Sequence, residues 1–256
     1  MTATSLRESG VPSGNVSIAA RMIDATKIYG SGDTIVRALD NITTEFPAGQ
    51  FTAIMGPSGS GKSTLLHCLA GLDRLSSGRV LIGEIDLSTL NDKQMTLIRR
   101  QRIGFVFQSF NLVPTLTAQE NILLPLALGN QKPDPGWFRS LIDALGIANR
   151  LHHRPAELSG GQQQRVAMGR ALITRPDLVF ADEPTGNLDS RSATELLEQM
   201  RAAVDNYQQT VVMVTHDARA ASFADRVVFL ADGRVVKDLQ APTTDTVLDT
   251  VRALES

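Results

Sequence analysis

The sequence has one cysteine, no long apolar run and no surplus of either charge. Cys68 is the single cysteine among 256 residues, which excludes disulfides and thiolate zinc sites within the chain and fits a reducing compartment. A membrane-spanning helix needs roughly 20 predominantly apolar residues, and the best uncharged stretch, residues 121–130, is short and contains Pro125. We therefore expect no membrane span, so that any membrane role comes through a partner.

The charges of the chain are balanced. Its 25 Lys and Arg residues against 27 Asp and Glu residues give a formal net charge of −2. Because no surplus of cations is available to displace counterions, a protein whose main task is to grip nucleic acid is disfavoured. Arg7 and Glu8 are followed by Gly, Pro, Ser and Asn instead of an apolar core, so we expect no secretory signal and a cytoplasmic location.

Apolar patterns along the chain predict one α/β core with two additions. Residues 1–17 are rich in Ser, Thr, Gly, Pro and Asn, which predicts a flexible N-terminal extension. Short strand patterns with tight turns follow and predict antiparallel strands, whereas residues 108–170 have a mostly helical pattern. From Leu178 onward strands alternate with helices, which predicts a parallel sheet covered on both faces. The tail, residues 241–256, has the spacing of a short helix, and packing on its own domain is favoured over packing on a partner.

A glycine-rich loop lies between a strand pattern and a helical pattern, and it fits G-x-x-x-x-G-K-[ST]. The glycines let backbone N–H groups curl toward phosphate oxygens, and the following helix adds its dipole. Lys62 is expected to reach the β- and γ-phosphates of a nucleotide and Ser63 to ligate Mg²⁺. In this context nucleotide binding is strongly favoured over a simple turn with a helix cap. The loop consists of Gly56, Pro57, Ser58, Gly59, Ser60, Gly61, Lys62, Ser63 and Thr64.

The phosphate loop alone does not distinguish a kinase, a GTPase and an ATPase. No [NT]-K-x-D segment, with which GTPases usually read guanine, occurs in the chain. Tyr29 ends a strand pattern upstream of the loop, where its ring could stack on adenine. A half-buried residue at a strand end fits the same spacing, so both interpretations of Tyr29 stay open here.

Three further strand patterns end in polar side chains, at the edge where ligands bind in open α/β sheets. Asp182 is placed to hold Mg²⁺ through its water shell. Glu183, if it points to the opposite side of the same strand, could polarise a water toward the γ-phosphate. Gln108 and His216 follow two other strands, and His216 could donate a hydrogen bond to the γ-phosphate. The alternative for each residue is a solvated strand end or turn with no function. For the two carboxylates this alternative is disfavoured, because a phosphate loop is present upstream.

The segment Leu158-Ser159-Gly160-Gly161-Gln162 opens a helical pattern. A Ser followed by two glycines can form a second anion-binding helix start, although an ordinary capped helix fits equally well. The letters LSGGQ resemble the signature of the ATP-binding-cassette (ABC) ATPases, and the segment stands upstream of Asp182 as in that family. In the same pattern Tyr29 matches the adenine-stacking aromatic, Gln108 the Q-loop, Asp189 the D-loop and His216 the switch histidine.

The resemblance covers residues 18–240 and implies a nucleotide-binding domain with the α/β fold of P-loop NTPases. That fold has a RecA-like parallel-sheet core, an antiparallel β subdomain and a helical subdomain. The resemblance also implies Mg²⁺-dependent ATP hydrolysis by a head-to-tail homodimer, in which each ATP lies between residues 56–64 of one chain and residues 159–162 of the other. In this scheme the catalytic residues are Glu183, His216 and Lys62, and Mg²⁺ is surrounded by Ser63, Gln108 and Asp182.

Two stretches refine the resemblance. The macrolide-export and lipoprotein-release group has similar sequences at residues 181–189 (ADEPTGNLD) and 158–170 (LSGGQQQRVAMGR). The division-associated ATPases are close relatives of this group. Members of this group power a separate membrane permease, which would hold the chain at the inner face of the cell membrane through a groove on the helical subdomain. Export or extraction of a substrate is the expected task. Gly169 replaces the alanine usual in that helix, and close packing is expected there.

Two alternative functions would involve partners other than a transport permease. A soluble cassette ATPase acting on DNA or ribosomes is disfavoured, because those relatives usually carry two cassettes, a coiled-coil insertion or a basic arm. A cassette ATPase that only regulates a partner enzyme at the membrane stays open. The transported substrate is not encoded here, since in this family it contacts the permease.

Overall fold

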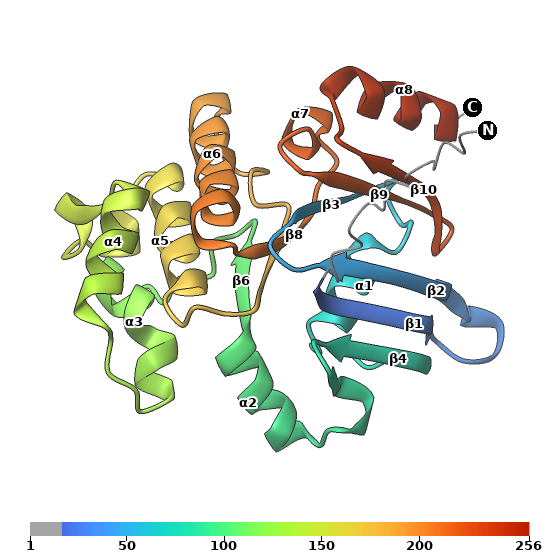
Figure 1. The fold of residues 1–256 in the computed structure, drawn as a ribbon, viewed down its shortest axis with the longest axis horizontal. Helices are drawn as coiled ribbons and strands as arrows, with labels where there is room; N and C mark the ends of the chain where they lie inside the picture. Colours follow the sequence, from blue (N-terminus) through green and yellow to red (C-terminus); the bar gives the residue numbers. More distant parts are fainter. Residues whose placement is uncertain (1–16, 256) are drawn as a thin grey trace, which may run out of the picture.

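The fold is built on two β-sheets, seen in the computed structural model, which describes residues 17–255 (Figure 1). The central sheet is parallel except for its last strand, β10, which runs antiparallel to β9. All five residues of β3 and of β8 are buried, as expected for strands covered on both faces. The strand order is β10 (Arg234–Gln240), β9 (Arg226–Ala231), β3 (Phe51–Met55), β8 (Thr210–Val214), β7 (Leu178–Asp182) and β6 (Ile103–Phe107).

The second sheet is antiparallel and lies beside α1 (Lys62–Leu69) (Figure 1). Its inner face and α1 share one apolar cluster, in which Met22, Phe46 and Leu65 are fully or almost fully buried. This packing places the end of β1 next to the start of α1. The strand order is β2 (Val36–Pro47), β1 (Ile18–Tyr29), β4 (Ser77–Ile82) and β5 (Ile85–Asp86), with short turns of 3-10 helix at η1 (Gly32–Thr34) and η2 (Leu87–Thr89).

Three helices form a lobe at the β6 edge of the central sheet, on the left in Figure 1. Local sequence signals begin and end them: Thr117 and Glu120 form a capping box, Asp134 caps the next helix, and Gly146 ends it in a left-handed conformation. A Cβ on Gly169 would lie 3.2 Å from side-chain atoms of its neighbours, so the expectation of close packing there is confirmed. The helical lobe comprises α3 (Ala118–Leu128), α4 (Pro135–Leu145) and α5 (Gly160–Leu172), with η3 (Ala148–Arg150) and η4 (Pro155–Glu157) between them.

The remaining helices connect the strands or follow them. The helix α2 (Asp92–Arg102) leads into β6, and α6 (Ser190–Tyr207) joins β7 to β8 and packs beside α5. After β8 comes the short α7 (Ala218–Ala221). The last helix, α8 (Thr244–Glu255), packs on α7 and buries Val247 completely.

Several sequence predictions can be compared with this architecture. The α/β class, with a parallel core, an antiparallel sheet and a helical part, is confirmed. The edge strand β10 was not predicted, because its exposed and polar sequence lacks the apolar alternation of a strand. The predicted N-terminal extension lies outside the described residues, apart from Ser17. Within residues 17–255 no helix is long and apolar enough to cross a bilayer.

Candidate nucleotide-binding site

The phosphate loop (residues 56–64) joins the end of β3 to the start of α1. Gly56 has φ +147°, and a Cβ there would lie 2.0 Å from the carbonyl oxygen of Leu230. Gly61 has φ +100°, and its Cβ would lie 2.2 Å from the carbonyl oxygen of Ala38. Only glycine fits these two positions, because neighbouring backbone approaches so closely. The loop is thus held in its curled form by strands of both sheets.

Lys62 places its ammonium group inside this loop. Its Nζ donates hydrogen bonds to the carbonyl oxygens of Gly56 at 2.9 Å and Pro57 at 2.7 Å. Burial lowers the pKa of Lys62, while the carboxylates of Glu183 and Asp182 oppose that shift. The loop therefore presents a positive charge whose partners are backbone carbonyls, and a phosphate oxygen is a stronger partner for it than these.

Asp182, the last residue of β7, faces the start of α1. Burial raises the pKa of its carboxyl group, and a hydrogen bond with the Ser63 side chain acts in the opposite direction. Its Oδ1 is buried without a hydrogen-bond partner, and the Nε2 of His67 lies 3.8 Å from its Oδ2. A carboxylate with a free oxygen beside a hydroxyl suits Mg²⁺, which is held by one or two protein oxygens plus phosphates and keeps several waters. Within residues 17–255 no cluster of three or more His, Cys, Asp or Glu offers a metal site made of protein groups alone.

Glu183 is not part of the strand, which corrects the strand-based prediction of its direction. β7 ends at Asp182, and Glu183 adopts a left-handed conformation with φ +47°. Its backbone N–H donates to Val214 at 3.0 Å, and a turn closes when the N–H of Gly186 donates to the Glu183 carbonyl. The Oε2 of Glu183 lies 2.9 Å from the Nδ1 of His216. The turn, and not strand alternation, therefore directs the carboxylate toward His216.

The predicted Q-loop and D-loop residues are joined through Asn187. The Nε2 of Gln108 donates to the Oδ1 of Asn187 at 3.3 Å, and the Nδ2 of Asn187 donates to the Gln108 carbonyl at 3.1 Å. Asp189 caps α6 by accepting from the N–H groups of Arg191 and Ser192. The structure thus brings Gln108 next to the D-loop segment.

Residues 159–162 form a capped helix start at α5. The N–H of Ser159 donates to the Oε1 of Gln162 at 3.0 Å, and the N–H of Gln162 donates to the Oγ of Ser159 at 3.3 Å. A Cβ on Gly161 would lie 2.7 Å from the Oγ of Ser192, so α5 and α6 are in close contact there. In the described part of the chain no hydrogen bond joins this segment to the phosphate loop. Gly160 and Gly161 instead neighbour Asn187, Leu188 and Ser192, around the start of α6.

Sequence reasoning missed Gln164, which connects three parts of the site. Its side chain is fully buried on α5, and its Nε2 donates to the carbonyls of Phe107 at 3.1 Å and Pro184 at 2.6 Å. Phe107 immediately precedes Gln108, and Pro184 immediately follows Glu183. The signal in the sequence was a polar residue on the buried stripe of a helix.

Tyr29 ends β1, as predicted, and it lies beside the start of α1. Its hydroxyl donates to the Oδ2 of Asp73 at 2.6 Å, and the side chain of Thr64 is near enough to lower its pKa. Burial and the bond to Asp73 raise the pKa of Tyr29. The ring is 40% exposed, and Val36, its partner in the antiparallel register, is exposed beside it. Together they form an exposed apolar platform next to the phosphate loop.

Three features define a P-loop nucleoside triphosphatase: a curled glycine loop after the central strand β3, a lysine within that loop, and a carboxylate at the end of β7, which β8 separates from β3. The family model described as "ABC transporter" matches residues 39–186, more than half of the chain. The chain belongs to the ABC transporter family, and it is an ATPase that binds and hydrolyses ATP.

Relatives and solved structures agree with this membership. A lipoprotein-releasing system ATP-binding protein, LolD of Geobacter metallireducens, is 44% identical over 87% of this chain and 100% of its own length. The macrolide export ATP-binding/permease protein MacB of Brucella melitensis is 44% identical over 85% of this chain, which spans only 34% of MacB. A dimer of the cassette MJ0796 with ADP and Pi has a TM-score of 0.78 and 40% identity, covering 88% and 99% of the two chains. The predicted resemblance to the macrolide-export and lipoprotein-release group is confirmed. The roles of single residues stay predictions.

Proposed function

We propose that this ATPase powers a separate membrane permease and that its task is export of a substrate or its extraction from the membrane. The observation that carries the proposal is a docking groove of about 460 Å³ between the core and the helical lobe. Apolar side chains dominate its lining, and two of them, Leu72 and Leu128, are 46% and 65% exposed. The names of LolD and MacB support the same task.

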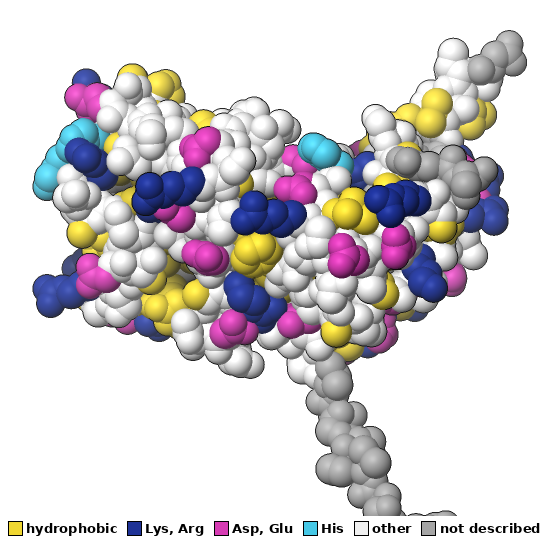
Figure 2. Space-filling view, turned by 90° about the horizontal axis from the view of Figure 1, so that it is seen from above, with side chains coloured by type: hydrophobic (Ala, Val, Ile, Leu, Met, Phe, Trp, Pro, Cys, Tyr) yellow, Lys and Arg dark blue, Asp and Glu magenta, His cyan; other side chains and the backbone are white. Residues whose placement is uncertain are grey.

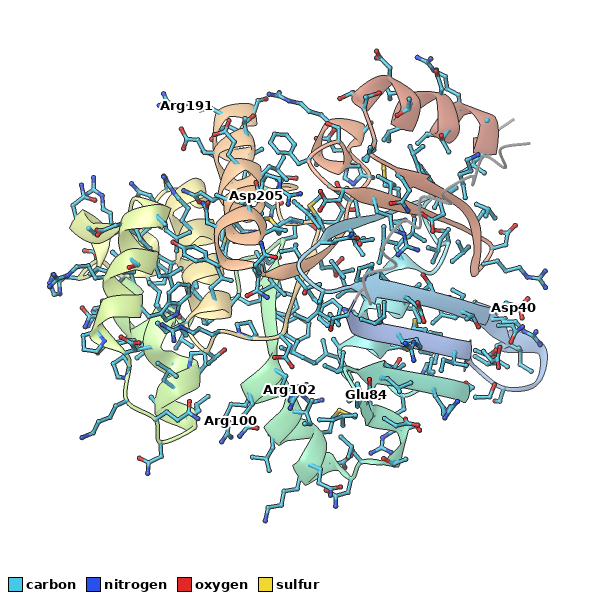
Figure 3. The ribbon with its side chains drawn as sticks, in the orientation of Figure 1. Asp40, Glu84, Arg100, Arg102, Arg191 and Asp205 are labelled. Atoms are coloured by element: carbon cyan, nitrogen blue, oxygen red, sulfur yellow. The ribbon has the colours of Figure 1, made fainter. Side chains whose placement is uncertain are left out.

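The shape and chemistry of the groove favour an amphipathic helix as its occupant. Phe105 and Phe107 stack at 5.3 Å along one wall, and exposed apolar surface of this kind marks interaction sites. Arg100 lies on the side of α2 that faces α3 (Figure 3), and its Cδ packs near Gly129. Arg99 and Arg170 also line the groove, so acidic or amide groups flanking the apolar face of the helix would be favoured.

At the ATP site we assign residue roles from the contacts described above. The ring of Tyr29 stacks on the adenine. Lys62 and the N–H groups of residues 56–64 bind the β- and γ-phosphates. Ser63, Asp182 and Gln108 hold Mg²⁺, which supplies charge neutralisation at the phosphates when bound. Glu183 polarises the attacking water, and His216 holds the Glu183 carboxylate and reaches the γ-phosphate.

A second copy of the chain completes the site in this proposal. Residues 159–162 contact the start of α6, and their capped helix start offers N–H groups to an anion. Two structural neighbours are dimers of the cassette MJ0796. A head-to-tail homodimer would set residues 159–162 of one chain against the ATP on residues 56–64 of the other.

We place this dimer at the inner face of the cell membrane, held there through the docking groove. The alternative of a nucleic-acid-bound cassette finds no support on the face drawn in Figure 2, where basic and acidic side chains are interspersed. Balanced charge over the whole chain agrees with this, since phosphate backbones require a surplus of cations.

The test is affinity purification of Glu183→Gln from native membranes with ATP and Mg²⁺. This change removes the proposed base but keeps the volume, so it should trap an ATP-bound dimer, which size-exclusion chromatography detects. A polytopic membrane protein should co-purify, and it should be lost when Leu128→Asp is added while the dimer persists. Recovery of ribosomes or nucleic acid in its place, or retention of the membrane protein by the Leu128→Asp variant, would contradict the proposal.

A further inference from the structure

Two charged side chains outside the predicted site surround Tyr29. Asp73, in the segment after α1, accepts the Tyr29 hydroxyl on Oδ2 and the Lys27 ammonium on Oδ1, both at 2.6 Å. The Nζ of Lys27 also lies 4.7 Å from the centre of the Tyr29 ring. One tyrosine is therefore held at its hydroxyl and over its ring by a single ion pair.

The positions of these residues follow from strand geometry. Lys27 and Tyr29 are two residues apart on β1, so their side chains leave the same side of the strand. The side chain of Lys27 is largely buried against the ring, which is favourable because the ring face carries negative potential. With Lys27 over one face of the ring, stacking is left to the opposite face. Val36, the cross-strand partner of Tyr29, is exposed next to it.

The same hydroxyl also lies beside the phosphate loop. The side chain of Thr64, at the loop's end, is close enough to the Tyr29 hydroxyl to lower its pKa, and Asp73 follows the helix that this loop begins. The bond from Tyr29 to Asp73 therefore ties the ring to the segment that follows the loop and its helix. The base and the phosphates of a nucleotide are joined covalently, so the distance between them is limited. A ring held at a set distance from the phosphate loop therefore suits a nucleotide.

We infer that Asp73, together with Lys27, is a positioning residue that holds Tyr29 in its adenine-stacking orientation before ATP arrives. The inference rests on the proposed role of Tyr29 and adds the residues that set its orientation. Immobilising a side chain in advance removes an ordering cost of binding, and one side chain of this kind corresponds to roughly three- to tenfold in affinity. Neither Asp73 nor Lys27 touches the nucleotide in this scheme.

The experiment measures binding of ATP and of inorganic tripolyphosphate by calorimetry, with Mg²⁺ present. Asp73→Ala and Tyr29→Phe should each weaken ATP binding by roughly three- to tenfold, because each frees the ring. The double variant should be no weaker than Tyr29→Phe alone, since both changes break the same contact. Binding of tripolyphosphate, which has no base, should stay as in the unchanged chain for all three variants.

Asp177→Ala is the matched control. Asp177 pairs with Arg102 at 2.9 Å at the opposite edge of the central sheet, so this variant also loses one surface ion pair but should bind ATP normally. Unchanged ATP affinity in Asp73→Ala, or equal weakening of ATP and tripolyphosphate, would overturn the inference and leave Asp73 a structural residue. Failure of the unchanged chain to bind ATP would instead overturn the proposed nucleotide site itself.

Discussion

Replacing Gln164 by leucine tests whether this residue positions groups of the ATP site or only stabilises the fold. The amide of Gln164 donates to the carbonyls of Phe107 and Pro184, which adjoin Gln108 and Glu183. Leucine has a similar volume but no donor, so the buried Pro184 carbonyl loses its bond to the amide, whereas the Phe107 carbonyl still accepts the N–H of Phe110 at 3.1 Å. We expect the ends of β6 and β7 to shift relative to α5, and the two catalytic side chains to shift with them.

The magnitude follows from counting the groups left unpaired. A buried polar group without a partner costs about 1–3 kcal/mol, and the Pro184 carbonyl is the group left unpaired. Leucine recovers part of this, because the buried Oε1 of Gln164 has no partner and disappears with the amide. A net loss of about 1–2 kcal/mol corresponds to a Tm lower by roughly 2–8 °C for a chain of this size. A displacement of ~1 Å at Glu183 would reduce kcat by roughly 100-fold.

Gln209→Leu is a matched control within the same chain. Gln209 is almost fully buried and also donates to two carbonyls, those of Pro176 at 3.0 Å and Thr210 at 3.2 Å, but at the start of β8. Thermal unfolding and steady-state ATPase assays on both variants should show similar losses of Tm, with kcat reduced only in Gln164→Leu. A normal kcat in Gln164→Leu, or an equal reduction in both variants, would refute the positioning role of Gln164.

Three further predictions concern glycines and a cap. Gly56→Ala should abolish ATP binding in a calorimetric titration because its Cβ would meet Leu230, whereas Gly59→Ala, whose Cβ would meet open space but whose φ of +79° strains any side chain, should weaken binding without abolishing it. Gly161→Ala should lower Tm by parting α5 from α6, and adding Ser192→Gly should restore it. Hydrogen bonds from Ser192 hold the pKa of Asp189 below its usual value, so its stabilisation exists above the unfolded pKa and is lost as pH falls through the folded one. Asp189→Ala should therefore lower Tm at neutral pH, and the difference should vanish in acid; a constant difference would contradict this.

Local signals account for the parts of the fold that the sequence predicted well. In α2, β6 and β8 the bounds are set by a cap or by an apolar run between polar neighbours, and such signals can be read from the sequence. The edge strand β10 has neither signal, and it pairs only with β9. Its exposed face carries polar residues that a loop would also carry, so periodicity could not identify it.

The site was predictable wherever a motif is contiguous. Residues 56–64 and 158–162 carry their chemistry in adjacent positions, and the structure forms a curled loop and a capped helix start from them. Gln164 and Asp73 were missed because their partners are distant in the sequence and are brought close only by the packing of α5 and α1. The prediction that Glu183 continues the strand was wrong, because a positive φ is not visible in a strand pattern.

Buried polar atoms without partners show where the fold keeps capacity for a ligand. Ser60 Oγ lies within the phosphate loop and Asp182 Oδ1 at the end of β7, both buried and unpaired. Each such group costs about 1–3 kcal/mol in a folded chain, and the ammonium of Lys62 meanwhile bonds only to carbonyls of its own loop. Phosphate oxygens and hydrated Mg²⁺ supply the acceptors and donors that these groups need. Nucleotide binding therefore removes an existing instability, which makes the loop and the end of β7 the region whose order depends most on ATP.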